Sequence, residues 1–167
     1  LVLGRQGIVG SWLDDTFGDA DEKRLGGQAA LMAVQLKQLG ADASLYPAFL
    51  SVDQAKLLEG HVKIPTPVKK KLAFINPLKA ARAEDATNAS WIFEFKHGQV
   101  LQWGTERIET PRDNRLIVSY PAAYVPAFRP DIEPLLPALA KQLDLLIVSG
   151  YHALHKKTYK EHLKTIT

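Results

Sequence analysis

The stretch "LGGQAALM", residues 25–32, places two glycines and an amide side chain directly before an apolar helical pattern. From Gln28 onward, Met32, Leu36 and Leu39 fall at positions i, i+4 and i+7, which is one face of an amphipathic helix. A glycine at position 40 then stops the pattern. The stretch therefore predicts a glycine turn that opens a helix packed through this face.

The two glycines have a functional and a structural interpretation. Without side chains at Gly26 and Gly27, a ligand can approach the backbone, and free N–H groups at the helix start can donate to anionic or hydroxyl oxygens. Gln28 offers a donor and an acceptor, which suits a sugar hydroxyl. A tight turn with a glycine N-cap explains the same residues, because two glycines before a helix are not specific.

Segments on both sides of this turn alternate between helix and strand. A short helix is expected from Ser11 to Gly18, a strand at residues 43–46, and a helix at residues 51–59 capped by Ser51 or Asp53. Such alternation is typical of α/β proteins.

The middle of the chain has a different pattern. Prolines at 65, 67 and 77 predict a surface excursion. The apolar runs 91–95 and 100–103 flank the turn 96–98, which predicts a hairpin. With further strands expected at residues 107–109 and 115–119, residues 88–119 form a small β-rich unit.

A third zone follows, in which residues 132–143 show an apolar stripe at helical spacing. Pro137 argues for a late start or a kink. The run 145–148 is continuously apolar, as in a buried parallel strand, and it ends at Ser149-Gly150-Tyr151-His152, where open α/β sheets usually bind ligands. His152 is a candidate for the cleft, or else a structural histidine.

Composition limits the classes of function. The chain has 167 residues, 46% of them hydrophobic, which is enough for a core; its net charge of +3 is too scattered to indicate a nucleic-acid partner. The absence of cysteine fits the cytoplasm, and no apolar run is long enough to span a membrane. The five histidines show no metal-binding spacing. An opening residue that is not methionine suggests a fragment.

Four segments, taken together and in order, carry a resemblance to a known family. They are "DEKRLGGQAALMA" at 21–33, "WIFEF" at 91–95, "DNRLIVS" at 113–119 and "LLIVSGYHAL" at 145–154. In this order they resemble the ADP-dependent sugar kinases, the glucokinase and phosphofructokinase family. The resemblance implies an α/β, ribokinase-like fold with a Rossmann-type sheet and a small β-rich lid that closes over sugar and nucleotide.

The resemblance also implies domains, roles and ligands. Residues 1–87 and 120–167 would belong to the large α/β domain and 88–119 to the lid. Gly26, Gly27 and Gln28 would bind the sugar, while Asn114 and Arg115 would lie at the nucleotide phosphates. The ligands implied are ADP, a hexose or hexose phosphate, and Mg²⁺, with AMP released. From its own chemistry, Arg115 could instead form a surface ion pair with Glu106 or Glu109.

Departures from the family pattern leave the substrate open. Glucokinases have a histidine where this chain has Ser90, so glucose is in doubt, and a sugar phosphate would need basic side chains. Candidates for that role are Lys69, Lys70, Lys71, Arg82 and Lys96.

Two motifs of the family are not found in the chain. They are the Gly-x-Gly-Asp segment, whose aspartate acts as base, and the Asn-x-Asp of the first strand. The alternatives are therefore a non-catalytic sugar- or nucleotide-binding relative and an ATP-dependent ribokinase-like kinase. The oligomeric state is left open.

Overall fold

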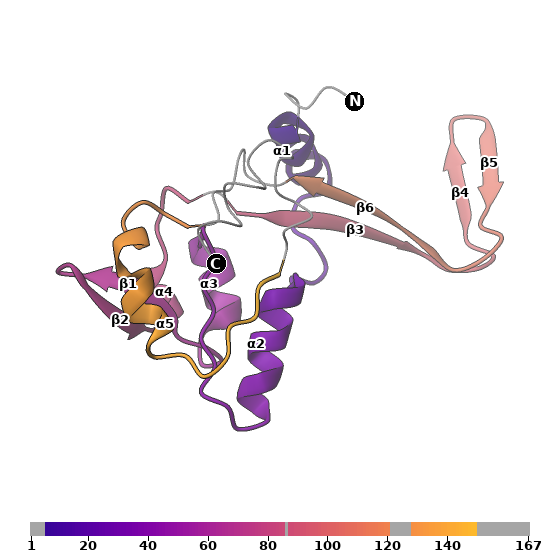
Figure 1. Cartoon of the computed structure of the whole chain (residues 1–167). Coiled ribbons are helices and arrows are strands. Elements are labelled where there is room, and N and C mark those ends of the chain that lie inside the picture. The colour runs from indigo at the N-terminus through magenta and orange to yellow at the C-terminus, as the bar shows by residue number, and fades with distance from the viewer. Residues whose placement is uncertain (1–5, 86, 121–127, 150–167) are drawn as a thin grey trace, which may run out of the picture. The chain divides into compact units, whose positions relative to one another are not determined.

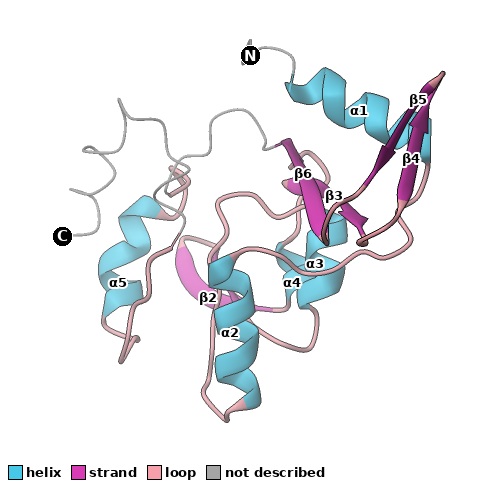
Figure 2. Cartoon of the chain, turned by 90° about the vertical axis from the view of Figure 1, so that its right-hand side faces the viewer, coloured by secondary structure: helices cyan, strands magenta, loops and turns pink. Residues whose placement is uncertain are grey.

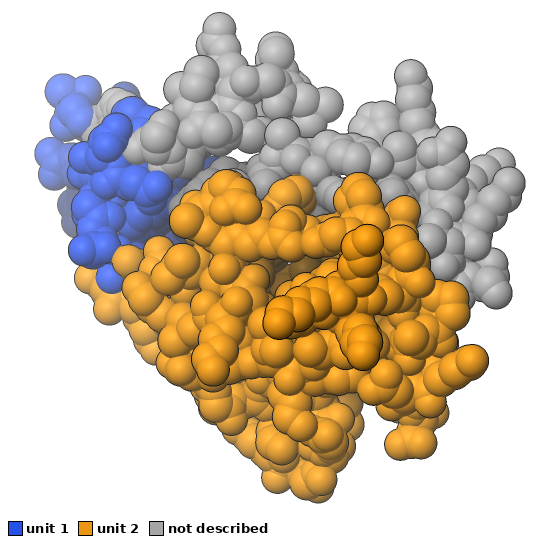
Figure 3. Space-filling model, turned by 90° about the vertical axis from the view of Figure 1, so that its left-hand side faces the viewer, with its two compact units in different colours: residues 1–20, 88–121 blue, residues 21–87, 122–167 orange. Residues whose placement is uncertain are grey.

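The computed structural model describes residues 6–85, 87–120 and 128–149 (Figure 1), a mixture of helix and strand (Figure 2). It divides into two compact units, distinguished in Figure 3. Unit 1 contains residues 1–20 and 88–121, and unit 2 contains residues 21–87 and 122–167. The three-part domain division expected from the sequence stays a prediction.

The core of unit 2 lies among α2 (Gln28–Gln38), α3 (Val52–Leu58) and the start of β1 (Ile64–Val68). Its buried apolar residues are Ala33, Leu45, Leu50, Ala55, Leu58, Val62 and Ile64. The predicted helix at 51–59 is confirmed as α3, which begins with a capping box. In that box the Ser51 hydroxyl accepts from the Gln54 backbone N–H, and the Gln54 side chain accepts from Ser51 N–H.

Helix α2 is confirmed, but the face expected to be buried is wrong. Met32 and Leu39 are 39% and 79% exposed, whereas Ala33 is buried and Ala29 packs against the core. Small side chains allow α2 to approach the core closely, and this close approach places the larger side chains outside.

The proline-rich excursion forms a hairpin followed by a short helix. Strand β1 pairs antiparallel with β2 (Lys71–Ile75), and α4 (Pro77–Ala80) follows. A proline can sit in a two-stranded ribbon because one edge of each strand needs no partner. Lys69 and Lys70 form the turn, both with positive φ, at 49° and 62°.

In the last described part of unit 2, the helix expected from the apolar stripe at residues 132–143 is short. A 3₁₀ helix, η2 (Glu133–Leu135), leads into α5 (Leu136–Ala140), which has a proline in its first turn. Residues 145–148 do not form the expected buried strand. They have no regular secondary structure, and Leu145 is 71% exposed. Of the strand expected at 43–46, a single parallel bridge remains, between Ser44 and Lys63.

Unit 1 contains α1 (Gln6–Phe17) and four strands: β3 (Ala89–Phe95), β4 (Val100–Trp103), β5 (Glu106–Glu109) and β6 (Asn114–Tyr120). The predicted pairing of 91–95 with 100–103 is wrong, because β3 pairs with β6, and β4 pairs with β5. Gly104, whose φ is 59°, lies in the turn that joins β4 to β5. After β5, the Thr110 carbonyl accepts from Gly98 N–H, and Thr110 N–H donates to the Gln99 carbonyl. The chain then returns so that β6 pairs with β3.

An aromatic cluster packs α1 against one face of β3. The ring of Phe17 lies 6.0 Å from Trp91 and 5.2 Å from Phe93, centroid to centroid. Trp91 Nε1 also donates to Asp14 Oδ1 at 3.0 Å. Because side chains alternate along a strand, Ser90, Ile92 and Glu94 lie on the other face and are exposed.

Within the described ranges, no helix is long and apolar enough to cross a membrane.

Candidate functional site

The glycine turn before α2 combines a structural need with open space. Gly27 is the N-cap of α2 and has φ 82° and ψ 136°, a backbone conformation that residues with side chains rarely adopt. Its carbonyl accepts from Leu31 N–H at 3.1 Å. Gly26 has no such φ, and a Cβ added at either glycine would meet no atom within 4 Å. The N-cap interpretation therefore accounts for Gly27, while nothing in the described fold requires glycine at 26.

The structure brings Gln28 together with a segment far along the chain. The Ser149 hydroxyl donates to Gln28 Oε1 at 3.1 Å, across 121 positions of sequence. The first and fourth segments behind the family resemblance thus meet at their polar residues. Sequence reasoning did not assign Ser149, although its position at the end of an apolar run was the available signal. His152, the other candidate in this segment, lies outside the described residues.

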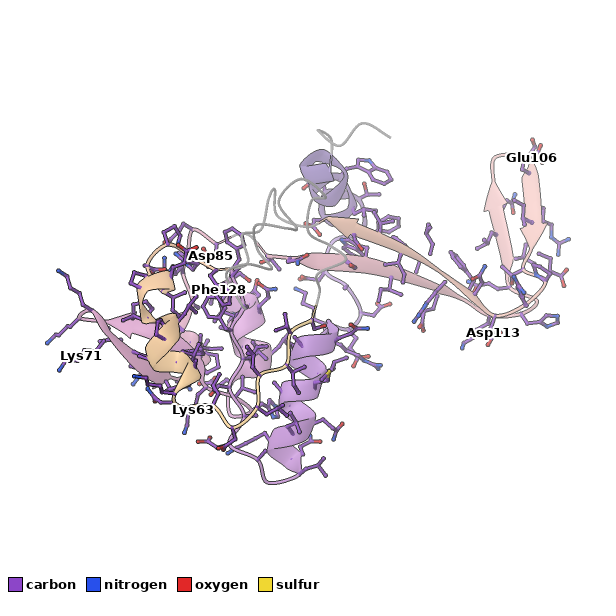
Figure 4. The ribbon with its side chains drawn as sticks, in the orientation of Figure 1. Lys63, Lys71, Asp85, Glu106, Asp113 and Phe128 are labelled. Atoms are coloured by element: carbon purple, nitrogen blue, oxygen red, sulfur yellow. The ribbon has the colours of Figure 1, made fainter. Side chains whose placement is uncertain are left out.

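Asn114 and Arg115 open strand β6 in unit 1. Arg115 lies directly opposite Glu94 in β3, and Asn114 Oδ1 accepts from the Arg115 backbone N–H at 2.9 Å. Both residues line an open hollow together with Glu94, Phe95, Lys96 and Asp113. In the part of the chain that the structure describes, Arg115 forms no ion pair with Glu106 or Glu109, so the surface-pair alternative is not observed. Figure 4 shows Asp113 at the base of the β4–β5 hairpin and Glu106 at its tip.

One carboxylate of this hollow has a perturbed acidity. Asp113 accepts a backbone hydrogen bond from His97 at 2.8 Å, and Lys96 Nζ lies 3.6 Å from its other oxygen. The His97 hydrogen bond and, secondarily, the Lys96 charge lower the pKa of Asp113. Asp113 therefore carries a negative charge beside Arg115 under ordinary conditions.

The basic residues considered for a sugar phosphate are dispersed. Arg82 pairs with Asp131 at 2.7 Å, and Lys96 pairs with Asp113. Lys69, Lys70 and Lys71 lie at the end of the β1–β2 hairpin, where Figure 4 shows Lys71. Within the described ranges, no hydrogen bond or ion pair joins any of the five to Gln28 or Ser149.

A second polar cluster in unit 2 was not anticipated from the sequence. Arg129 pairs with Asp85 at 3.4 Å and Asp131 at 3.6 Å, and its backbone N–H donates to the Tyr46 hydroxyl at 3.0 Å. Burial, reinforced by the nearby Asp131 charge, raises the pKa of Tyr46. These residues and Arg82 line a cavity of about 30 Å³. Its two arginines and two aspartates compensate one another, so the cluster joins chain segments and does not offer an anion site.

Metal ligands are the remaining question. In the part of the chain that the structure describes, no three His, Asp or Glu side chains lie together so as to hold a metal ion.

Comparison with known proteins tests the resemblance. Residues 6–166 match the model of a family described as "ADP-specific Phosphofructokinase/Glucokinase conserved region". The chain belongs to this family. The membership in the ADP-dependent sugar kinases that the four sequence segments suggested is thus confirmed.

Individual members of the ADP-dependent kinase family agree. An ADP-specific phosphofructokinase of Pyrococcus horikoshii is 35% identical over 94% of this chain and 37% of its own length. An ADP-dependent glucose/glucosamine kinase of Pyrococcus furiosus is 31% identical over 87% of this chain and 32% of its own length. The chain therefore spans about a third of the length of these relatives.

Solved structures agree as well. The crystal structure of a phosphofructokinase from Pyrococcus horikoshii with AMP superposes with a TM-score of 0.78 and 30% identity, covering 95% of this chain and 37% of that one. An ADP-dependent kinase in complex with fructose 6-phosphate and ADPβS gives a TM-score of 0.71 at 30% identity over 94% of this chain and 35% of its own.

Proposed function

We propose that this chain forms part of an ADP-dependent kinase that transfers the terminal phosphoryl group of ADP to a hexose or hexose phosphate and releases AMP. The observation that carries the proposal is the family match over residues 6–166. Two further facts support it: relatives of similar fold were crystallised with AMP and with fructose 6-phosphate plus an ADP analogue.

In this reaction, a sugar hydroxyl oxygen bonds to the β-phosphorus of ADP, and the bond from that phosphorus to the bridging oxygen breaks. The electron pair leaves with AMP, and the hydroxyl proton passes to a base. Catalysis of such a transfer is mainly positioning and neutralisation of charge on the phosphoryl oxygens. We assign no base among the described residues.

Each unit would contribute its own part. In unit 2, Gly26 and Gly27 leave room beside the backbone, and Gln28 would hydrogen-bond the sugar. In unit 1, Arg115 has a guanidinium without an ion-pair partner among the described residues, and it would bind the phosphates of the nucleotide alongside Asn114.

Magnesium stays part of the proposal through the resemblance alone, since no group of three metal-ligating side chains lies among the described residues. When bound, it would supply positive charge to the phosphate oxygens. We propose that the reaction takes place in the cytoplasm.

The test is AMP release from ADP by the full-length protein in which this segment occurs, with Mg²⁺ present. Glucose, fructose 6-phosphate and no sugar are assayed in parallel, and ATP replaces ADP in a further arm. We expect AMP release that depends on the presence of a sugar. The sugar that gives the higher rate of AMP release identifies the substrate.

A variant pair connects the activity to the proposed phosphate site. Arg115→Ala should lower kcat by about 10²- to 10³-fold, the magnitude typical of removing a group that stabilises transition-state charge. The exposed Arg112→Ala, three positions away, should leave kcat within about twofold. Equal kcat values for the two variants would show that Arg115 does not bind the phosphates of the nucleotide.

The remaining outcomes separate the alternatives. Sugar-dependent turnover with ATP alone would indicate the ATP-dependent kinase. A folded protein that binds sugar or nucleotide but releases no AMP would be the non-catalytic relative.

A further inference from the structure

We infer that Ser149 is a positioning residue that fixes the orientation of the Gln28 amide, so that Gln28 presents its NH₂ group to an acceptor oxygen of the substrate. The inference rests on the proposed function, which places the substrate at Gln28. It adds Ser149 to the site and states which half of the amide faces the ligand.

The argument begins with the chemistry of the amide. A glutamine side chain carries an acceptor oxygen and a donor NH₂ in one plane, on opposite sides of its Cγ–Cδ bond. Rotation by half a turn exchanges the two, so an unconstrained glutamine serves donors and acceptors alike. A specific site needs one orientation held in place.

Ser149 supplies that constraint. Its hydroxyl lies 3.1 Å from Gln28 Oε1, and because an amide oxygen only accepts, the hydroxyl must donate. The hydrogen bond engages one lone pair of Oε1 and directs Nε2 away from Ser149, on the other side of the Cγ–Cδ bond. In the described part of the chain, no protein acceptor bonds Nε2, and in the inference its hydrogens are the ones that meet the ligand.

The backbone places Gln28 and Ser149 next to each other. Gln28 is the first residue of α2, and Gly27 sets its direction through a φ of 82°. The chain after α5 runs alongside α2 toward the same helix end, where Ser149 reaches Gln28 (Figure 1). Gln28 is exposed, so nothing else packed around its amide would hold the orientation.

The consequence concerns ligand chemistry. A presented NH₂ group favours an acceptor oxygen of the ligand, such as a sugar hydroxyl oxygen, a carbonyl oxygen or a phosphoryl oxygen. Glucose and fructose 6-phosphate both carry such oxygens, so the inference holds for either sugar.

The experiment measures kcat and KM for the sugar in variants of the full-length protein. Ser149→Ala should raise KM by about 2- to 10-fold, the equivalent of one ordinary hydrogen bond, with kcat within about twofold. Ser149→Thr, which keeps the hydroxyl, should restore KM. Gln28→Glu still accepts from Ser149 but has no donor, so its KM should rise at least as far as that of Gln28→Ala. Ser44→Ala, at another serine of unit 2, is the control and should match wild type.

Two results would overturn the inference: a KM unchanged in Ser149→Ala, or a KM for Gln28→Glu equal to that of wild type. An increase in KM that Ser149→Thr does not restore would indicate a packing role only.

A spectroscopic measurement keeps the inference separate from the activity. In ¹⁵N-labelled protein, the side-chain NH₂ resonances of Gln28 should shift in Ser149→Ala and not in Ser44→Ala. If the wild type releases no AMP with any sugar, the proposed function fails. The amide resonances then still decide whether Ser149 orients Gln28, and unchanged resonances would refute it.

Discussion

Asp85 shows how one enclosed charge can join distant parts of a chain. Its side chain is 6% exposed, and Oδ2 accepts from Leu50 N–H at 2.8 Å while pairing with Arg129. The carbonyl of Leu50 in turn accepts from Arg82 N–H at 3.1 Å. The segments around residues 50, 85 and 129 are therefore held together mainly through one carboxylate.

Replacing Asp85 with alanine should lower the free energy of unfolding by about 3 kcal/mol. The substitution leaves the Leu50 N–H without its acceptor in a buried place, and it takes from Arg129 one of its two carboxylate partners. Urea unfolding of the two proteins measures the difference. Asp42→Ala, which removes an exposed ion pair with Lys63, should lower it by less than about 1 kcal/mol. Similar losses for the two variants would contradict the role given to Asp85.

Tyr46 should make stability depend on alkaline pH. Burial raises the pKa of its hydroxyl above the ordinary value of 10.0. Because the raised pKa belongs to the folded state, the stabilising contribution is complete below about pH 10 and is lost as the pH rises beyond it.

Absorbance at 295 nm, compared between wild type and Tyr46→Phe, tests this expectation. The two titration curves should coincide around pH 10 and separate only at higher pH, where Tyr46 ionises or the protein unfolds. One additional tyrosinate in the wild type near pH 10 would show that Tyr46 is not held protonated.

At the scale of elements, α3 depends on its first residue. Ser51 is 6% exposed and takes part in both hydrogen bonds of the capping box, and its hydroxyl also accepts from Thr87 at 2.9 Å. The cap begins a helix of seven residues that is too short to form without tertiary support. Its other support is burial of Ala55 and Leu58 in the core of unit 2.

Ser51→Ala should lower the free energy of unfolding by about 1 kcal/mol, the usual effect of losing a helix cap. Thermal or urea unfolding measures it. Thr105→Ala, an exposed change in the turn between β4 and β5, should stay within about 0.5 kcal/mol of wild type. If the two substitutions lower the free energy of unfolding equally, the cap does not stabilise the protein more than an exposed side chain does.

At the scale of the whole molecule, burial is unevenly distributed between the units. Among the described residues of unit 1, Leu13 and Thr110 are the buried ones, whereas unit 2 has a connected apolar core. Every residue of β5 is exposed. Regions with few buried contacts open at lower free energy than core elements.

Hydrogen exchange followed by mass spectrometry should therefore show an order. Peptides covering β4 and β5 should exchange first, and those covering α3, where Ala55 is fully buried, should exchange last. Equal protection of the two regions, or the reverse order, would contradict this difference in stability.

The amino-acid sequence by itself determined the features that depend on neighbours along the chain. The helix after Gly27, the cap at Ser51 and the strands around residues 91–95 and 115–119 were predictable because capping, periodicity and β-branched or aromatic runs act locally. The family membership was predictable for a similar reason, since four short segments in order were enough.

Tertiary structure decided which of these pieces meet. A strand pattern does not encode its partner, so it could not show that β3 pairs with β6 and not with β4. Helical spacing marks apolar faces but not how closely a helix approaches the core, so the alanine face of α2 was missed. The contacts of Gln28 with Ser149 and of Asp85 with Arg129 join residues distant in sequence. Such contacts exist only once the chain has folded, because burial and shape, which are properties of the assembled molecule, select them.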